Sequence, residues 1–313
     1  MKNISTGKSR SQAAKKKVAV GIDLGDRTSR YCLLDEEGVV IGEASTPTTK
    51  AGIAKVFGAM ARCRVALEVG GHSPWVSRQL EAYGHEVIVA NPQNVRLIGE
   101  STRKDDRLDA RTLARLARID PMLLSPVRHQ GAEAQADLAV VRARRALVRA
   151  RTMLINAARG LTKSFGERLH KCGAGQAGPT LAAELSPQIR AAILPLLAEV
   201  EALNQRIAAY DRQLEQLVKE HYPEVERLKQ VKGVGTLIAL TFVLTVDDPN
   251  RFQRSRDVGC YMGLRPGRRN SGKSEPQLHI SKEGDCYMRS LLSKERTTFS
   301  VPLGSTVIYA AGV

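Results

Sequence analysis

The first ninety residues carry short runs of apolar and β-branched residues separated by polar turns, a pattern typical of strands. Five such runs predict strands, which cover Val18–Ile22, Thr28–Leu34, Val39–Ala44, Val65–Val69 and Glu86–Ala90. Amphipathic stretches between the last three runs predict helices over Ala51–Ala61 and Trp75–Tyr83. The order of three strands, helix, strand, helix and strand predicts a mixed α/β sheet flanked by helices.

Helical patterns dominate the middle of the chain. Asp106 and Asp109 stand at the head of one helical pattern, and Ala132–Phe165 predicts a single long helix. After a glycine-rich break over 166–179, a heptad seam has apolar residues spaced alternately by four and three, namely Leu196, Val200, Leu203, Ile207, Tyr210, Leu214 and Leu217. The seam predicts a coiled coil, whose partner is either the long basic helix of the same chain or another subunit.

The last third of the chain predicts short helices joined by polar loops. The stretch V-K-G-V-G-T-L-I-A-L-T resembles the hairpin of a helix-hairpin-helix, in which Gly233 and Gly235 would let backbone N–H groups approach a phosphate. A plain turn between two helices is the alternative. Phe252–Leu264 follows as a short amphipathic segment, and Pro266–Lys282 as a polar, basic loop.

These patterns divide the chain into segments, with Pro121 and Pro126 marking a linker. The predicted segments are a disordered basic arm over 1–17, a sheet domain over 18–125, a helical and coiled-coil region over 126–222, a mostly α-helical domain over 223–292 and an aberrant tail over 293–313. The first domain has the strand order of a ribonuclease-H-like nuclease fold.

The composition points to a polyanionic partner. The formal net charge is +16 and aromatic residues make up only 4%, so binding is expected to use Lys and Arg on phosphates instead of base stacking. Five scattered cysteines without a C-x-x-C pair predict reduced, mostly core thiols and no zinc site. No membrane span or signal peptide is expected, and the reduced thiols predict a cytoplasmic protein.

Four acidic residues stand where strand ends can meet. Asp23 follows the first predicted strand and Glu68 ends the fourth, while Asp106 and Asp109 project from one face of a helix's first turn. Converging carboxylates repel unless a cation lies between them, and their hard oxygens suit Mg²⁺. The pattern therefore predicts a site for two Mg²⁺ ions that acts on a phosphodiester.

Simpler interpretations of these acids exist. An Asp after a strand is often a turn former, and G-I-D-L-G also occurs as a phosphate loop in sugar-kinase-like folds. Asp106 and Asp109 would also complement a helix dipole. We interpret His72 and His85 as loop and surface residues and not as ligands.

The long helix over 132–165 carries many arginines and almost no opposing acid. This imbalance predicts that Arg142, Arg145 and Arg149 contact a nucleic-acid backbone. A merely solvated helix face is the alternative.

Five motifs in order make a family resemblance specific: G-I-D-L-G, A-L-E-V-G-G, K-D-D-R-L-D-A-R-T-L-A, the K-G-V-G hairpin, and C-Y-M-G-L-R-P-G-R-R-N-S-G-K followed by I-S-K-E-G-D-C-Y-M-R. Together they resemble the insertion-sequence one-ten family, the DEDD transposases related to the Piv site-specific invertases. The resemblance covers residues 18–292. It implies a RuvC-like domain in which Asp23, Glu68, Asp106 and Asp109 bind Mg²⁺.

The resemblance also implies a C-terminal domain whose serine attacks DNA and becomes covalently joined to it. Ser271 matches the family's S-G step, and Arg268, Arg269 and Lys273 around it would hold the phosphate. Ser281 in I-S-K is the second candidate. Without the resemblance, Ser271 reads as a turn residue before a glycine.

The resemblance implies that the protein is a recombinase that works as a dimer or tetramer. Its partners would be the DNA of the element ends and of the target. A structured bridge RNA would guide it by base pairing. Two alternatives remain open: an endonuclease of the Holliday-junction type that hydrolyses DNA with its acids alone, and an inactive nucleic-acid-binding remnant.

The tail departs from the family pattern after Leu292. The family continues with helices rich in Ala, Leu and Arg, whereas this chain reads S-K-E-R-T-T-F-S-V-P-L-G-S-T. We expect that the gene carries a frameshift near Ser293. The nucleotide sequence of the locus tests this, because the adjacent frame should encode a family-like tail, and its absence there would exclude the frameshift.

Overall fold

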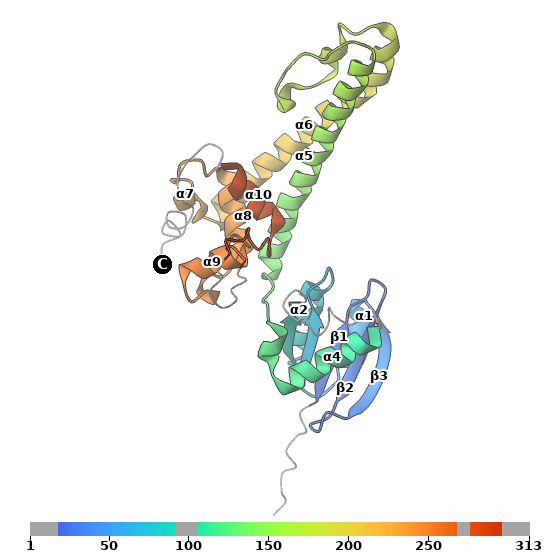
Figure 1. The fold of residues 1–313 in the computed structure, drawn as a ribbon, viewed down its shortest axis with the longest axis vertical. Coiled ribbons are helices and arrows are strands. Elements are labelled where there is room, and N and C mark those ends of the chain that lie inside the picture. Colours follow the sequence, from blue (N-terminus) through green and yellow to red (C-terminus); the bar gives the residue numbers. More distant parts are fainter. Residues whose placement is uncertain (1–17, 92–105, 268–275, 296–313) are drawn as a thin grey trace, which may run out of the picture. The chain divides into compact units, whose positions relative to one another are not determined.

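The computed structural model describes residues 18–91, 106–267 and 276–295. The basic arm over 1–17 and the residues from 296 onward lie outside them. Contacts within the chain divide it into two units, the first ending at His129 and the second beginning at Gln130 (Figure 1). The boundaries drawn from the sequence remain predictions.

The first unit is built on one mixed sheet of five strands. They are β1 (Ala19–Asp23), β2 (Thr28–Leu34), β3 (Val40–Pro47), β4 (Arg64–Glu68) and β5 (Glu86–Ala90). Their order is β3-β2-β1-β4-β5. The first three strands pair antiparallel, whereas β4 runs parallel to both β1 and β5. This confirms the predicted mixed sheet.

Helices cover both faces of the sheet (Figure 1). On one face, α1 (Lys50–Phe57) and α2 (Ser73–Ala82) pack on alternate residues of β1, β4 and β5, including Val20, Ile22 and Leu67. The other face, which presents Ala19 and Ala66, is covered by α4 (Asp106–Ile119). Three layers result, as the alternation of apolar residues requires.

The closest contact between layers joins β1 to α4 at Gly21. A Cβ added there would lie 1.9 Å from the carbonyl oxygen of Ala110 and 2.5 Å from the amide nitrogen of Ala114. Real side chains cannot occupy that space, so the helix backbone rests directly on the strand. The approach holds the first turns of α4 against the end of β1.

Three arginine side chains anchor α4 along its length. Arg111 donates from Nε to Glu43 Oε1 on β3 at 2.9 Å. Arg118 donates to the backbone carbonyl of Glu36 at 3.0 Å, and Arg64 on β4 donates to that of Ala117 at 3.0 Å. These contacts hold the helix on the sheet.

The predicted linker around Pro121 and Pro126 is wrong, because this segment packs on the first unit. Pro121 opens a 3₁₀ helix, η1 (Pro121–Leu124), whose Leu124 is fully buried. Val127 then donates its N–H to the carbonyl of Val89 on β5 at 2.9 Å. Proline fits the first helical position as well as a loop, so composition alone cannot distinguish the two.

The second unit is helical, and its longest elements pair with each other. They are α5 (Ala132–Ser164) and α6 (Pro187–His221). Arg144 binds both carboxylate oxygens of Asp211 at 2.5 and 3.2 Å, and Arg151 donates to Asn204 Oδ1 at 2.8 Å. The predicted long helix is therefore confirmed, and the partner of the apolar seam is the basic helix of the same chain.

The buried stripe of α6 differs from the predicted seam at its ends. Val200, Leu203, Ile207 and Leu214 are buried as predicted, but Leu197 and Val218 replace Leu196 and Leu217. An α-helix has 3.6 residues per turn, so its buried stripe drifts away from a strict heptad. Supercoiling of the pair stays a prediction.

Short elements complete the second unit: η2 (Ala174–Gln176), η3 (Pro179–Ala182), α7 (Val225–Leu228), α8 (Thr236–Val246), η4 (Pro249–Arg251), α9 (Ser255–Tyr261) and α10 (Cys286–Glu295). α8 lies in a core with Leu138 and Val141 of α5 and with Met288 of α10. No helix in the described part of the chain is long and apolar enough to cross a membrane.

Substitution Gly21→Ala tests the contact between β1 and α4. The added methyl group meets helix backbone, so we expect the first unit to lose about 3 kcal/mol of stability, the upper end for overpacked cores. Trp75, the chain's single tryptophan, lies in this unit and reports its unfolding in urea by fluorescence.

Gly71→Ala is the control, because nothing lies within 4 Å of a Cβ added at that position. Equal unfolding midpoints for the two variants would show that the close approach at Gly21 is not required.

Candidate active site

Asp23 and Glu68 end neighbouring parallel strands and face the same side of the sheet. Along β1, Ala19 and Gly21 face α4, and Asp23 is the next residue in that alternation. Along β4, Ala66 faces α4 and Glu68 follows two residues later. Ile22 lies opposite Leu67 in the β1–β4 pairing, so the two acids occupy the next position of each strand.

The third acid arrives from the helix on that face. Asp109 lies in the first turn of α4 and directly precedes Ala110, whose carbonyl oxygen faces Gly21. The negative charges of Asp109 and Asp23 both act on Glu68. Three of the four predicted carboxylates are therefore brought together.

The fourth predicted acid, Asp106, is the first residue of α4. Its backbone lies one helical turn before Asp109, on the same side of the helix. Its side chain lies outside the described part of the structure.

Glu68 has a raised pKa and a buried oxygen atom. Burial raises its pKa above the usual 4.5, and the charges of Asp109 and Asp23 raise it further. Its Oε1 is buried and has no hydrogen-bond partner among the described residues. An unsatisfied buried acceptor costs about 1–3 kcal/mol. The carboxylate therefore sits where a proton or a cation would stabilise it.

The chemistry of these donors fits a hard divalent cation. Carboxylate oxygens are the ligands that Mg²⁺ prefers, and Glu68 Oε1 is a buried oxygen that still needs a positive partner. Among the described residues, no three His, Cys, Asp or Glu side chains lie close enough to hold an ion as they stand. The acids thus form a negatively charged edge and not a closed cage of ligands.

The loop after Glu68 contains contacts that the sequence did not indicate. Ser73 Oγ lies 2.9 Å from His129 Nε2 and 2.9 Å from both the N–H nitrogen and the carbonyl oxygen of Gly70. Ser73 before a proline signals only a helix start. His129 is 56 positions away from Ser73, so no local pattern in the sequence identifies the two residues as partners.

The two histidines of the first unit differ in environment. His72 is a loop residue, as expected, and it accepts a hydrogen bond from Trp75 Nε1 at 3.1 Å while its Nε2 lies 3.5 Å from Asp26. His85 is buried, so its prediction as a surface residue is wrong. Its Nδ1 accepts a hydrogen bond from the amide N–H of Cys63 at 3.3 Å, which satisfies a polar atom of the buried ring.

The cysteines are free, as expected for reduced thiols. Cys32 and Cys63 are buried, whereas Cys172 and Cys260 are partly exposed and Cys286 is exposed. The prediction of mostly core thiols is therefore correct for the sheet unit alone.

The arginines predicted to bind nucleic acid are partly engaged within the protein. Arg142 pairs with Asp285 at 3.1 Å, and the guanidinium of Arg145 lies 4.2 Å from the ring centre of Tyr287. Arg149 is exposed. Acid partners that the helix itself almost lacks come from residues far along the chain, and nucleic-acid binding by these arginines stays a prediction.

The glycines of the predicted hairpin lie in a turn between two helices. Gly233 has a φ of +87°, which favours glycine, and Gly235 caps the N-terminus of α8. The turn joins α7 to α8, which fits both the helix-hairpin-helix and the plain turn between helices. Phosphate binding there stays a prediction.

The predicted nucleophile, Ser271, lies outside the described residues, together with Arg268, Arg269 and Lys273. The two ends of its loop meet, since Gly267 donates to the carbonyl of His279 at 2.9 Å and Ser281 donates to that of Arg265 at 2.8 Å. Ser281 itself is exposed. The loop is thus held at its base on the second unit.

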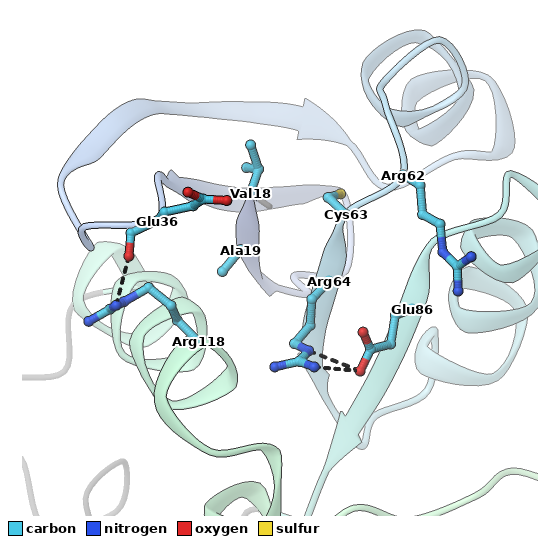
Figure 2. Close-up of a pocket in the computed structure, with 8 residues that line it drawn as sticks. All are labelled: Val18, Ala19, Glu36, Arg62, Cys63, Arg64, Glu86 and Arg118. Atoms are coloured by element: carbon cyan, nitrogen blue, oxygen red, sulfur yellow. Dashed lines mark hydrogen bonds and ion pairs between the residues drawn. The ribbon is translucent and has the colours of Figure 1, made fainter. Parts of the chain in front are cut away.

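A large pocket lies away from the carboxylates (Figure 2). It measures about 610 Å³ and is lined by Val18, Ala19, Glu36, Arg62, Cys63, Arg64, Glu86 and Arg118. These residues lie at the starts of β1, β4 and β5, in the turn after β2 and at the end of α4. This edge of the sheet is opposite to the one that carries Asp23 and Glu68. Its paired arginines, such as Arg64 with Glu86 at 2.9 Å, hold the fold together.

Open α/β sheets place their sites at the carboxyl ends of their strands, where this mixed sheet carries two of its acids. This arrangement is the one expected of a ribonuclease-H-like nucleic-acid enzyme. Comparison with known families agrees. Residues 20–165 match the model of the DEDD transposase domain of the IS110 family, described as "Transposase". Residues 225–295 match the model described as "Transposase IS116/IS110/IS902 family".

Individual relatives cover almost the whole chain. The transposase for insertion sequence element IS1111A of Coxiella burnetii is 30% identical over 92% of this chain and 79% of its own length. A probable family 20 transposase of Pseudomonas aeruginosa is 30% identical over 87% of this chain and 81% of its own. The transposase for insertion sequence element IS1328 of Yersinia enterocolitica is 26% identical over 87% and 81%.

The chain belongs to the IS110 family of insertion-sequence transposases. It is therefore a DNA-processing enzyme, and its DEDD region contains the converging acids. The resemblance drawn from the motifs is confirmed at this level.

Substitution Glu68→Gln is expected to stabilise the first unit when divalent ions are removed with EDTA. The pKa of Glu68 is raised in the folded state, so its contribution to stability is fully present below pH 4.5 and is lost as pH rises through the folded pKa. The glutamine avoids that loss, so its advantage should appear at neutral pH and vanish below pH 4.5. Urea unfolding followed by Trp75 fluorescence measures it.

Glu86→Gln is the matched control on β5, where Glu86 pairs with Arg64. It should not stabilise the protein at neutral pH. A Glu68→Gln variant that is no more stable than wild type at pH 7.5 would contradict the claim that the ionised Glu68 carboxylate destabilises the fold.

Proposed function

We propose that this transposase cleaves and exchanges DNA strands with Mg²⁺ bound at its carboxylate edge and a serine nucleophile on its second unit. The proposed ligands are Asp23, Glu68, Asp106 and Asp109, and two ions are expected. The proposed nucleophile is Ser271. A structured RNA would guide the enzyme to its DNA.

The observation that carries this proposal is the convergence of Asp23 and Asp109 on Glu68, whose buried Oε1 has no partner among the described residues. Like charges raise the pKa of Glu68 and work against folding, so the arrangement persists at a cost to stability. Such a cost is typical of functional sites, where a ligand completes the electrostatics. Membership of a transposase family supports DNA as the substrate.

Bound Mg²⁺ would supply positive charge that polarises the phosphodiester and steadies the oxygen atoms that enter and leave. The chain itself supplies the geometry. The β1–β4 pairing fixes Asp23 beside Glu68, and the Gly21 contact fixes Asp109 above them. The four carboxylates would hold the ions at one edge and leave the opposite side open to DNA.

The serine step would conserve the energy of the phosphodiester bond. The hydroxyl oxygen of Ser271 forms a bond to phosphorus as one phosphorus–oxygen bond of the DNA breaks. The serine proton leaves to a base or to solvent, and the displaced DNA oxygen takes up a proton as a free hydroxyl. Arg268, Arg269 and Lys273 would hold the phosphate during this exchange.

Several partners complete the proposal. The net charge of +16 suits an enzyme that holds both DNA and a guide RNA. Exposed Arg149 on α5 and the turn at Gly233 and Gly235 are proposed backbone contacts. A dimer or tetramer would let the carboxylate edge of one subunit meet the serine domain of another.

A second candidate function is hydrolysis of DNA by the carboxylate edge alone, as in endonucleases of the Holliday-junction type. Asp23, Glu68 and Asp109 all belong to the first unit. Their convergence within one unit supports this second function, because hydrolysis would need no side chain from the serine domain. Water would then replace the serine as the nucleophile.

Substitution Ser271→Ala separates the two functions. Wild-type protein incubated with element-end DNA, guide RNA and Mg²⁺ should form a covalent protein–DNA product, visible as a labelled band on a denaturing gel. The alanine variant lacks the attacking oxygen, so we expect the product to fall by about 10³-fold or more. Ser281→Ala is the control and should retain the product.

Asp109→Asn completes the test and should lose both the covalent product and strand cleavage. Cleavage without a covalent product in Ser271→Ala would favour the hydrolytic enzyme. Salt-sensitive DNA binding without any Mg²⁺-dependent cleavage by wild type would identify an inactive remnant.

A further inference from the structure

The loop between Glu68 and α2 is held by one buried hydroxyl group. Ser73 is fully buried, and its Oγ lies 2.9 Å from three polar atoms: the amide nitrogen of Gly70, the carbonyl oxygen of Gly70 and Nε2 of His129. Both backbone groups of Gly70 therefore bond to this side chain, and the Gly70 carbonyl also accepts from the backbone N–H of Ser73 at 3.2 Å. Gly70 lies two residues after Glu68.

The hydrogen-bonding capacity of a hydroxyl fixes the direction of each bond. A serine hydroxyl donates one hydrogen and accepts at two lone pairs. The Gly70 amide must donate and the Gly70 carbonyl must accept, which uses the serine hydrogen and one lone pair. The remaining lone pair faces His129, so Nε2 of His129 carries a hydrogen and donates it.

His129 reaches Ser73 on a firmly held segment. Val127, two residues earlier, is bonded to β5 through Val89 at 2.9 Å. Burial lowers the pKa of His129, and the nearby charge of Arg78 lowers it further, so the ring is neutral at pH 7. A neutral ring with hydrogen on Nε2 matches the donor that Ser73 needs.

We propose that Ser73 and His129 are positioning residues for Glu68. Sheet pairing holds β4 as far as Val69, whose N–H bonds the carbonyl of Ala90 at 3.0 Å. From Gly70 onward the hydroxyl of Ser73 takes over, and His129 orients that hydroxyl. The backbone that follows Glu68 is thus held at Val69 and Gly70, which limits movement of the strand end that carries a carboxylate whose Oε1 has no described partner.

This inference rests on the proposed Mg²⁺ site. Partners that orient a metal ligand typically change metal affinity or activity by about 10–100-fold when they are removed. Loss of either residue should therefore raise the Mg²⁺ concentration needed for half-maximal strand cleavage by about tenfold or more. The same shift should appear in the Mg²⁺-dependent rise of the unfolding temperature, followed by Trp75 fluorescence.

Ser73→Ala is the main variant, and Ser77→Ala is its matched control. Ser77 lies on the same helix, is 3% exposed, and donates its hydroxyl to the carbonyl of Pro74 at 3.1 Å. The two substitutions remove the same atoms from similar surroundings. Only Ser73→Ala should shift the Mg²⁺ half-point.

A second pair of variants tests His129. His129→Gln places an amide N–H near the position of Nε2 and should keep the Mg²⁺ half-point close to wild type. His129→Leu removes the donor and should behave like Ser73→Ala. All variants are made in the full chain, and their unfolding temperatures in EDTA identify any that merely unfold.

Ser73→Ala matching Ser77→Ala in both Mg²⁺ readouts would overturn the positioning role while leaving the proposed function intact. A His129→Gln variant that unfolds in EDTA at the wild-type temperature but has a raised Mg²⁺ half-point would show that His129 has no positioning role. A wild-type protein with no Mg²⁺ response in either readout would contradict the proposed function, and this inference with it.

Discussion

The direct contact of α4 with β1 at Gly21 determines the rest of the candidate site. Because position 21 has no side chain, the backbone at Ala110 and Ala114 lies against the strand, and Asp109 arrives beside the end of β1. Strand alternation then turns Asp23 and Glu68 toward the same helix. A larger residue at position 21 would move the helix by more than a metal site tolerates, since such sites require placement to within about 0.5 Å.

The convergence of acids works against stability, and the surrounding fold compensates. Glu68 has a raised pKa and a buried oxygen without a described partner, both of which disfavour the ionised, folded state. Apolar layers on both faces of the sheet and the ion pair of Arg111 with Glu43 hold the site in place. Functional sites commonly depart from local rules in this way, with stability supplied elsewhere.

Patterns within one element were readable from the sequence, and contacts between distant elements were not. Strand ends and the first helical turn identified Asp23, Glu68 and Asp109, because alternation and helical spacing are local. The burial of His85 depends on Phe57 and Cys63, and the pairing of Arg142 depends on Asp285, 143 positions away. The link between Ser73 and His129 belongs to the same group. Serine and histidine in loops have no periodic signal, so only the folded chain reveals their partnership.

Three segments far apart in sequence are proposed to share one site for divalent ions. Fe²⁺ bound in place of Mg²⁺, with ascorbate and peroxide, cuts the backbone near the ion, and mass spectrometry locates the cuts. Cuts are expected around residues 23, 68 and 106–109 together, and all of them should be lost in Glu68→Gln. Cuts confined to one of these segments, or an unchanged pattern in the variant, would contradict it.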